Sequence, residues 1–181
     1  MDKHELVALL QRNGVDTSLF GTGPAKTLEH LLKELHEEET ALIEDSTGLT
    51  RLTSVLRIDV LCTVNGKGYR LREDRQEFKD GRVRKRSFLS CSVAEKLKVG
   101  EKPNIHAVLR ALREELGITY VSSATKVRTS TSEEESPSYP GLQARFTNHD
   151  WVVAICPKDF RREGYTEVQS DKTTYFVWDE V

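Results

Sequence analysis

The apolar positions of the first 46 residues repeat at the spacing of helices. Leu6, Leu9 and Leu10 predict a first helix that ends near Asn13-Gly14. After a Gly-Thr-Gly-Pro break, a second helix is predicted from Thr27 onward by leucines at positions 28, 31, 32 and 35. We therefore expect an N-terminal helical extension over residues 1–46 and a main domain over residues 47–181.

From about residue 50 the pattern changes to β-branched and aromatic runs separated by turn residues. Residues 52–64 predict a long strand, Asn65-Gly66 a hairpin turn, and residues 69–78 the returning strand of an antiparallel meander. Further strands are predicted at 82–91, 119–128, 142–147, 151–156 and 173–178. The polar, acidic segment 129–138 predicts a mobile loop.

A third amphipathic helix is predicted over Ile105 to Leu116, with Asn104 as its cap and Gly117 as its left-handed stop. Its apolar stripe, which we expect to pack in the core, consists of Ile105, Val108, Leu109, Leu112 and Leu116. His106 and the charged residues fall away from the stripe, so adjacent carboxylates lie near the helix end.

The carboxylate pair, Glu114 and Glu115, has two interpretations. The first is a solvated helix face on which Arg110 and Glu114, four residues apart, contribute roughly 0.2–0.5 kcal/mol. The second is a cation site, because Mg²⁺ takes oxygen ligands, often one or two carboxylates together with substrate phosphates. Spacing alone leaves both open.

The segment from Gly100 to Ile118 resembles the signature of Nudix hydrolases. Its second half matches as Arg-Ala-Leu-Arg-Glu-Glu-Leu-Gly-Ile over residues 110–118, where only Ala111 departs from the family's glutamate. The Gly-Glu-Lys-Pro turn lies one residue too far from Arg110, and Ala94-Glu95 stands where the family has a glycine pair. The motif is therefore a degenerate Nudix box.

The resemblance implies an α+β fold, a Nudix-like α/β/α sandwich with a mixed sheet, over residues 47–181. It implies hydrolysis of a nucleoside diphosphate linked to another moiety, with Mg²⁺ or Mn²⁺ held by Glu114, Glu115 and Glu101. Glu115, Glu114 and Arg110 would be the catalytic set, in which Arg110 orients the carboxylates. The family usually takes a further acidic group from the C-terminal half, and the candidates are Glu163, Glu167 and Asp171.

Three arginines alternate on the predicted strand that precedes the box. Arg82, Arg84 and Arg86 would share one face. Guanidinium groups pair well with phosphate oxygens, so a substrate phosphate-binding role is one interpretation, and a charged strand that discourages edge pairing is the other. No aromatic residues interleave with them, so a small phosphorylated molecule is favoured over nucleic acid.

Composition agrees with a single main domain. The chain has 181 residues, 37% of them hydrophobic and 31% charged, and a net charge of −2, so it has no overall attraction to polyanions. We expect no membrane span, no secretory segment and a cytoplasmic location. Three cysteines, without the spacing of a zinc or redox site, are expected to be reduced core thiols: Cys62, Cys91 and Cys156.

Two functional hypotheses follow. In the first, the chain is a Mg²⁺- or Mn²⁺-dependent hydrolase, favoured slightly because both glutamates of the pair remain. In the second, it is a catalytically inactive Nudix-fold module that binds a phosphorylated ligand or a protein partner, as Ala111 and the altered turn suggest. The leucines of the N-terminal helices could also form a contact between copies in a homo-oligomer.

Overall fold

The computed structural model describes residues 1–85 and 91–181. Two compact units make up the chain. The first comprises Met1–Val55, Lys96–Glu101 and Thr129–Asn148, and the second comprises Leu56–Glu95, Lys102–Arg128 and His149–Val181. The boundary expected after residue 46 stays a prediction.

Both predicted N-terminal helices form in the first unit. Helix α1 (Lys3–Arg12) begins with a capping box between Asp2 and Glu5, and α2 (Leu28–His36) begins with one between Thr27 and His30. Their leucines pack in a core that also takes Tyr139 and Leu142 from the C-terminal half of the chain. A short 3₁₀ helix, η1 (Thr17–Leu19), lies between them.

A hairpin that the sequence did not predict follows α2. Strand β1 (Ala41–Asp45) pairs antiparallel with the start of β2 (Gly48–Val64), from Ala41 opposite Leu52 to Asp45 opposite Gly48. The polar turn favours this pairing because the Asp45 carboxylate accepts hydrogen bonds from the backbone N–H and the hydroxyl of Thr47, at 2.7 and 2.6 Å.

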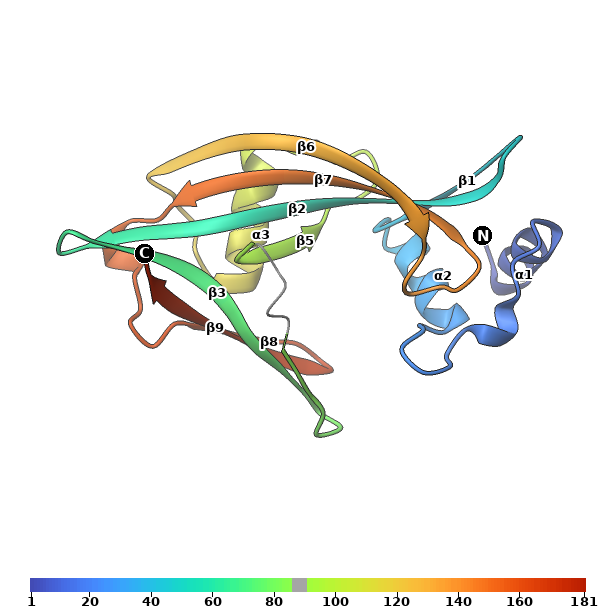
Figure 1. The fold of residues 1–181 in the computed structure, drawn as a ribbon, viewed down its shortest axis with the longest axis horizontal. Helices are drawn as coiled ribbons and strands as arrows, with labels where there is room; N and C mark the ends of the chain where they lie inside the picture. Colours follow the sequence, from blue (N-terminus) through green and yellow to red (C-terminus); the bar gives the residue numbers. More distant parts are fainter. Residues whose placement is uncertain (86–90) are drawn as a thin grey trace. The chain divides into compact units, whose positions relative to one another are not determined.

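The strands form a mixed sheet in the order β6-β7-β2-β3-β9-β8. The pairs β2–β3, β3–β9 and β8–β9 are antiparallel, whereas β7 runs beside β2 in the same direction (Figure 1). Two short strands join at the sides, β4 to β3 and β5 to β2. The α+β class and the mixed sheet are thus as expected. The bounds are β3 (Lys67–Phe78), β4 (Val83–Arg84), β5 (Val93–Lys96), β6 (Ser123–Glu135), β7 (Gln143–Ala154), β8 (Tyr165–Val168) and β9 (Lys172–Glu180).

Three predictions about where strands begin and end were wrong: one for a loop and two for strands. Residues 129–135 of the segment expected to be a loop belong to β6, an end strand whose polar side chains stay largely exposed, whereas residues 136–138 follow the strand as a turn. The two strands expected at 142–147 and 151–156 are one strand, β7, whose Asp150 pairs with Arg57 and Arg128. Of the strand expected over 82–91, the described residues show only Val83–Arg84.

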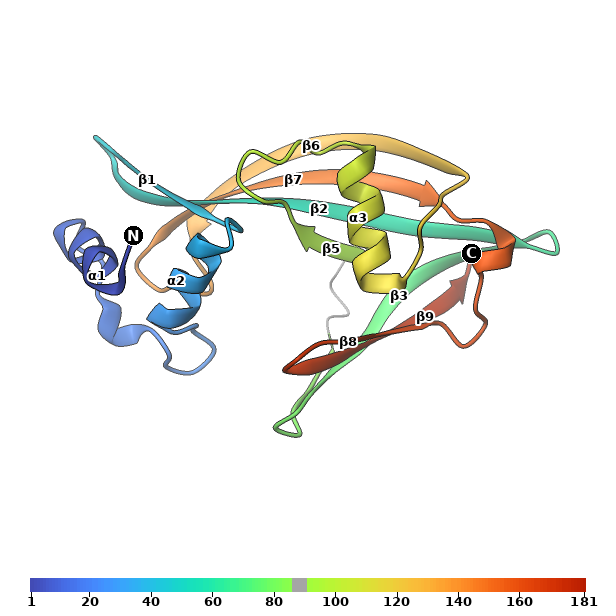
Figure 2. The ribbon, with the colours of Figure 1, turned by 180° about the vertical axis from the view of Figure 1, so that it is seen from behind.

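Helix α3 (Ile105–Leu116) has the predicted bounds (Figure 2). The Asn104 side chain accepts hydrogen bonds from the N–H groups of His106 and Ala107, and Gly117 ends the helix at φ 70°. Ile105 was expected to be part of the buried stripe but is 36% exposed. It is the first residue of the helix and precedes the first residue of the buried face. The buried face consists of Ala107, Val108, Ala111, Leu112 and Leu116.

The remaining sequence expectations concern membrane segments and cysteines. No helix among the described residues is both long and apolar enough to cross a membrane. All three cysteines are free thiols; Cys62 and Cys91 are buried as expected of core thiols, and Cys156 is partly buried.

Candidate functional site

Two carboxylates from separate elements of the second unit come together. Glu115 lies in the last turn of α3, and Glu167 lies on β8, within hydrogen-bonding reach of Glu115. Strand β8 is held in place by β9, with Glu167 opposite Thr174. The pairing of β8 with β9 therefore selects Glu167 as the acidic partner of the helix.

Gly164 permits β8 to take this position. Its φ is +86°, and a Cβ atom there would lie 1.8 Å from the carbonyl oxygen of Phe176 on β9. Only glycine combines the left-handed backbone with so close an approach to a neighbouring strand. A glycine three positions before Glu167 thus permits the close approach of β8 to β9.

The surroundings of Glu115 disfavour its charged form. Burial, followed by the negative charge and hydrogen bond of Glu167 and then the charge of Glu95, raises the pKa of Glu115 to about 8. Lys172 acts in the opposite direction. Carboxylates this close to one another are stabilised when they share a proton or face a cation.

Arg110 connects the helix to strand β5. Its Nη1 donates to Glu114 Oε2 at 2.8 Å and lies 3.3 Å from Glu95 Oε1. Glu114 therefore pairs along the helix surface, whereas Glu115 turns inward toward Glu167. Glu95, which stands where the Nudix signature has glycine, contributes a third negative charge near Glu115.

Ala111 lies one helical turn before Glu115 and is completely buried. The Nudix signature has a glutamate at this position, whereas here a methyl group packs in the core. The site consequently has two carboxylates within hydrogen-bonding reach of each other, with Glu95 exerting its charge from β5.

Glu101 belongs to the first unit, where its carboxylate accepts a hydrogen bond from the Lys98 N–H at 2.9 Å. Gly100 beside it has φ +81°, and the hydrogen bond from Lys98 to Glu101 closes this tight turn. Across residues 1–85 and 91–181, no three His, Cys, Asp or Glu side chains are grouped as a metal site. The metal-binding role expected for Glu101 stays a prediction.

The oxygen donors of Glu115 and Glu167 suit a hard divalent cation. Mg²⁺ is commonly held by only one or two carboxylates and completes its shell with water and substrate phosphates. Two partly buried carboxylates with a third negative charge nearby would gain from such a cation, because it removes their mutual repulsion. The donor set therefore fits Mg²⁺ or Mn²⁺.

The three arginines predicted to bind phosphate are not seen as one row. Arg82 pairs with Asp80 at 2.7 Å, and its guanidinium lies 4.9 Å from the ring centroid of Phe78. Arg84 is exposed on β4, opposite Gln76, and Arg86 falls outside the described residues. Their phosphate-binding role stays a prediction.

Two features of the second unit were not identified from the sequence. Glu167 could not be distinguished from Glu163 and Asp171, because only its pairing across β9 places it beside α3. Glu95 carried a signal, since it replaces a glycine of the signature, but its closeness to Glu115 depends on β5 pairing with β2.

Comparison with known proteins gives similarity at the level of structure. No family model matches the sequence, and no curated protein matches it. An Ap4A hydrolase of C. elegans is 15% identical, with a TM-score of 0.39 over 71% of this chain and 80% of its own. The Nudix domain of Shewanella oneidensis NrtR, crystallised with ADP ribose, is 9% identical, with a TM-score of 0.41 over 70% of this chain and 71% of its own. The functional assignment therefore rests on the residues of the site.

Proposed function

We propose that the chain is a Nudix-type hydrolase of a nucleoside diphosphate linked to another moiety, and that it uses Mg²⁺ or Mn²⁺. The observation that carries the proposal is the meeting of Glu115 with Glu167, on a helix that has the Arg-x-x-x-Glu-Glu-x-Gly pattern of the Nudix box. A pair of close, partly buried carboxylates has little structural purpose without a cation, because each disfavours ionisation of the other.

Glu115 and Glu167 would hold the cation in this proposal. When bound, such an ion polarises the phosphoryl group and lowers the pKa of a bound water. The negative charge of Glu95 strengthens the local attraction for a cation, and Lys172 offers a positive charge that suits a phosphate oxygen. Arg110 acts as a positioning residue, because its ion pairs with Glu114 and Glu95 restrain both carboxylates.

Ala111 lowers the expected affinity for the free cation without removing the site. One of the family's helix ligands is missing, so more of the coordination shell must come from the phosphates of the substrate. We therefore expect the cation and the diphosphate to bind together more tightly than either binds alone, which is a positive coupling of the two affinities.

Hydrolysis of a panel of nucleoside diphosphate derivatives with Mg²⁺ or Mn²⁺ tests the proposal. The panel includes ADP ribose and Ap4A, and products are separated by ion-exchange chromatography. We expect Glu115→Gln and Glu167→Gln each to lower the rate about 10²-fold or more. Glu163→Gln is the matched control, because Glu163 is an exposed acid just before β8 and should leave the rate unchanged.

A second candidate is the inactive module that binds a phosphorylated ligand, and buried Ala111 is the observation that favours it. It predicts no turnover by the native chain and a gain of turnover in Ala111→Glu, provided that thermal melting shows the variant to be folded. Loss of turnover in Glu167→Gln but not in Glu163→Gln would instead support the hydrolase. Equal turnover by the native chain, Glu167→Gln and Glu163→Gln would contradict the assigned carboxylates.

A further inference from the structure

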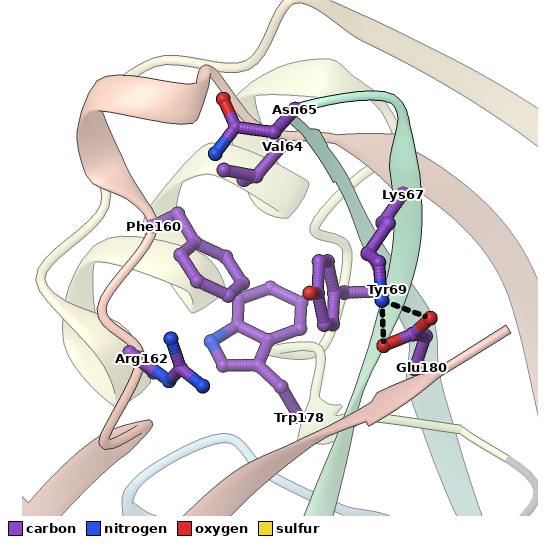
Figure 3. Close-up of a pocket in the computed structure, with 8 residues that line it drawn as sticks. All are labelled: Val64, Asn65, Lys67, Tyr69, Phe160, Arg162, Trp178 and Glu180. Atoms are coloured by element: carbon purple, nitrogen blue, oxygen red, sulfur yellow. Dashed lines mark hydrogen bonds and ion pairs between the residues drawn. The ribbon is translucent and has the colours of Figure 1, made fainter.

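A concave feature of the second unit lies at the end of the β2–β3 hairpin. It is a cavity of about 570 Å³, within the range of about 300–1,000 Å³ that is typical of small-molecule sites. Its walls come from the hairpin, from the segment around Phe160 and from the end of β9 (Figure 3). The proposed carboxylate function makes no use of it.

Three aromatic rings form one wall of the cavity. The ring centroids of Tyr69 and Phe160 are 5.0 Å apart, and those of Phe160 and Trp178 are also 5.0 Å apart. The Trp178 Nε1 donates to the carbonyl of Arg161 at 2.9 Å, and Tyr165 packs edge-on against the indole at 6.1 Å. These contacts fix the indole, and all three wall rings remain only partly buried.

The polar groups of the cavity give it one excess positive charge. Lys67 Nζ pairs with the carboxylate of Glu180 at 2.9 and 3.2 Å, so these two charges offset each other. Arg162 is exposed and forms no ion pair with any other described residue, and it lines the same cavity as Trp178 (Figure 3). A cationic ligand would be repelled by Arg162, whereas an anionic group would pair with its donors.

This cavity is separated from the carboxylate site along β9. Glu167 lies opposite Thr174, and Trp178 is four residues further along the strand, which corresponds to about 13 Å at roughly 3.3 Å per residue. A ligand in the cavity therefore need not touch the Glu115–Glu167 pair, and binding there does not depend on hydrolysis.

We propose that the cavity binds a nucleotide. Its planar base would stack on Trp178 and Phe160, and its phosphate would pair with Arg162. Stacking of a base on an aromatic side chain is worth about 1–3 kcal/mol and tolerates different bases. An aromatic wall with one adjacent guanidinium matches a ligand that joins a planar ring to a phosphate.

Tryptophan fluorescence tests the proposal directly. The chain has two tryptophans, and Trp151 is buried, so Trp151→Phe isolates the signal of Trp178. Without added metal, AMP should quench this signal saturably, adenosine should quench it with at least 10-fold weaker affinity, and inorganic phosphate should have no effect. AMP contains no diphosphate, so failure of the hydrolase proposal would not alter the result.

Adjacent arginines provide a matched pair of variants. Arg162→Ala should weaken AMP binding at least 10-fold and leave adenosine binding unchanged. Arg161→Ala should change neither, because the Arg161 guanidinium lies over the Tyr165 ring at 5.3 Å from its centroid. Phe160→Leu should weaken both ligands. Absence of quenching by AMP, or equal weakening by the two arginine variants, would overturn the proposal.

Discussion

Glu34 is a buried acid that pairs with three cationic side chains. It is only 5% exposed, and its carboxylate lies 2.6 Å from Lys26 Nζ, 2.7 Å from Arg51 Nη2 and 3.1 Å from Lys96 Nζ. Arg51 is itself 3% exposed and lies over the Tyr139 ring, 5.2 Å from its centroid. The acid thus compensates a guanidinium that the first unit has removed from water.

Replacement of Glu34 by glutamine should destabilise the protein strongly. The buried Arg51 would lose its ionic partner, and breaking a buried pair in this way costs about 3–5 kcal/mol. Urea unfolding followed by far-UV circular dichroism measures the change. Glu29→Gln is the matched control on the same helix, because its pair with Lys3 is exposed and should matter little. Equal effects of both variants would contradict this account.

The same residue predicts a pH dependence of stability. Burial alone would raise the pKa of Glu34, but the hydrogen bond from Lys26 and the charges of Lys96 and Arg51 outweigh it and lower the pKa to about 2. A lowered folded-state pKa contributes stability above the ordinary value of 4.5, and this stability is lost as the pH falls toward 2. The advantage of the native chain over Glu34→Gln should therefore shrink from pH 4.5 to pH 2; a constant difference in unfolding free energy across that window would refute it.

At the scale of elements, the hairpin of β8 and β9 depends on Gly164. Gly164→Ala introduces both a left-handed alanine and a Cβ atom 1.8 Å from Phe176 O, so we expect a loss of about 2–5 kcal/mol. Gly81→Ala is the matched control: its φ is +87°, no atom lies within 4 Å of the added Cβ, and only the backbone cost of about 1–2 kcal/mol remains. Unfolding in urea measures both, and the prediction fails if the two losses are equal.

Local signals determined how well each element could be predicted. The bounds of helix α3 were predicted correctly, because Asn104 and Gly117 mark its ends within the sequence itself. Strand β6 was mistaken for a loop in part, because its serines and glutamates lie on an end strand and are favoured there by pairing with β7 rather than by burial. Strand β8 was missed because it is short and follows a polar segment, and its place depends on β9.

In the candidate site, too, a residue within one short motif could be predicted, whereas a residue placed by strand pairing could not. Glu115 became a candidate because its helix resembles the Nudix box, whereas spacing alone left its role open. Its partner Glu167 could not be chosen among three acids, because closeness in space depends on the β8–β9 register, which no short segment encodes. The aromatic cavity was also beyond the sequence, since Tyr69, Phe160 and Trp178 are widely separated along the chain.

At the scale of the whole molecule, the tryptophans allow the stability of the second unit to be followed separately from that of the first. Both tryptophans, Trp151 and Trp178, lie in the second unit, together with Glu115 and Glu167. Tryptophan fluorescence therefore follows the unfolding of the unit that contains the proposed cation site. Helices α1 and α2 lie in the first unit. A cation held by Glu115 and Glu167 in the second unit should not directly stabilise the first unit.

Mn²⁺ should consequently stabilise the second unit. A ligand that binds only the folded state at 100 times its dissociation constant adds about 2.7 kcal/mol to the free energy of unfolding. We expect this gain, measured by urea unfolding with tryptophan fluorescence, in the native chain and in Glu163→Gln. Glu115→Gln and Glu167→Gln should lose it, because each removes one of the two oxygen donors and the shared charge that attracts the ion. A gain that persists in both of these variants would place the cation elsewhere in the unit, and turnover would then have to be explained without the Glu115–Glu167 pair.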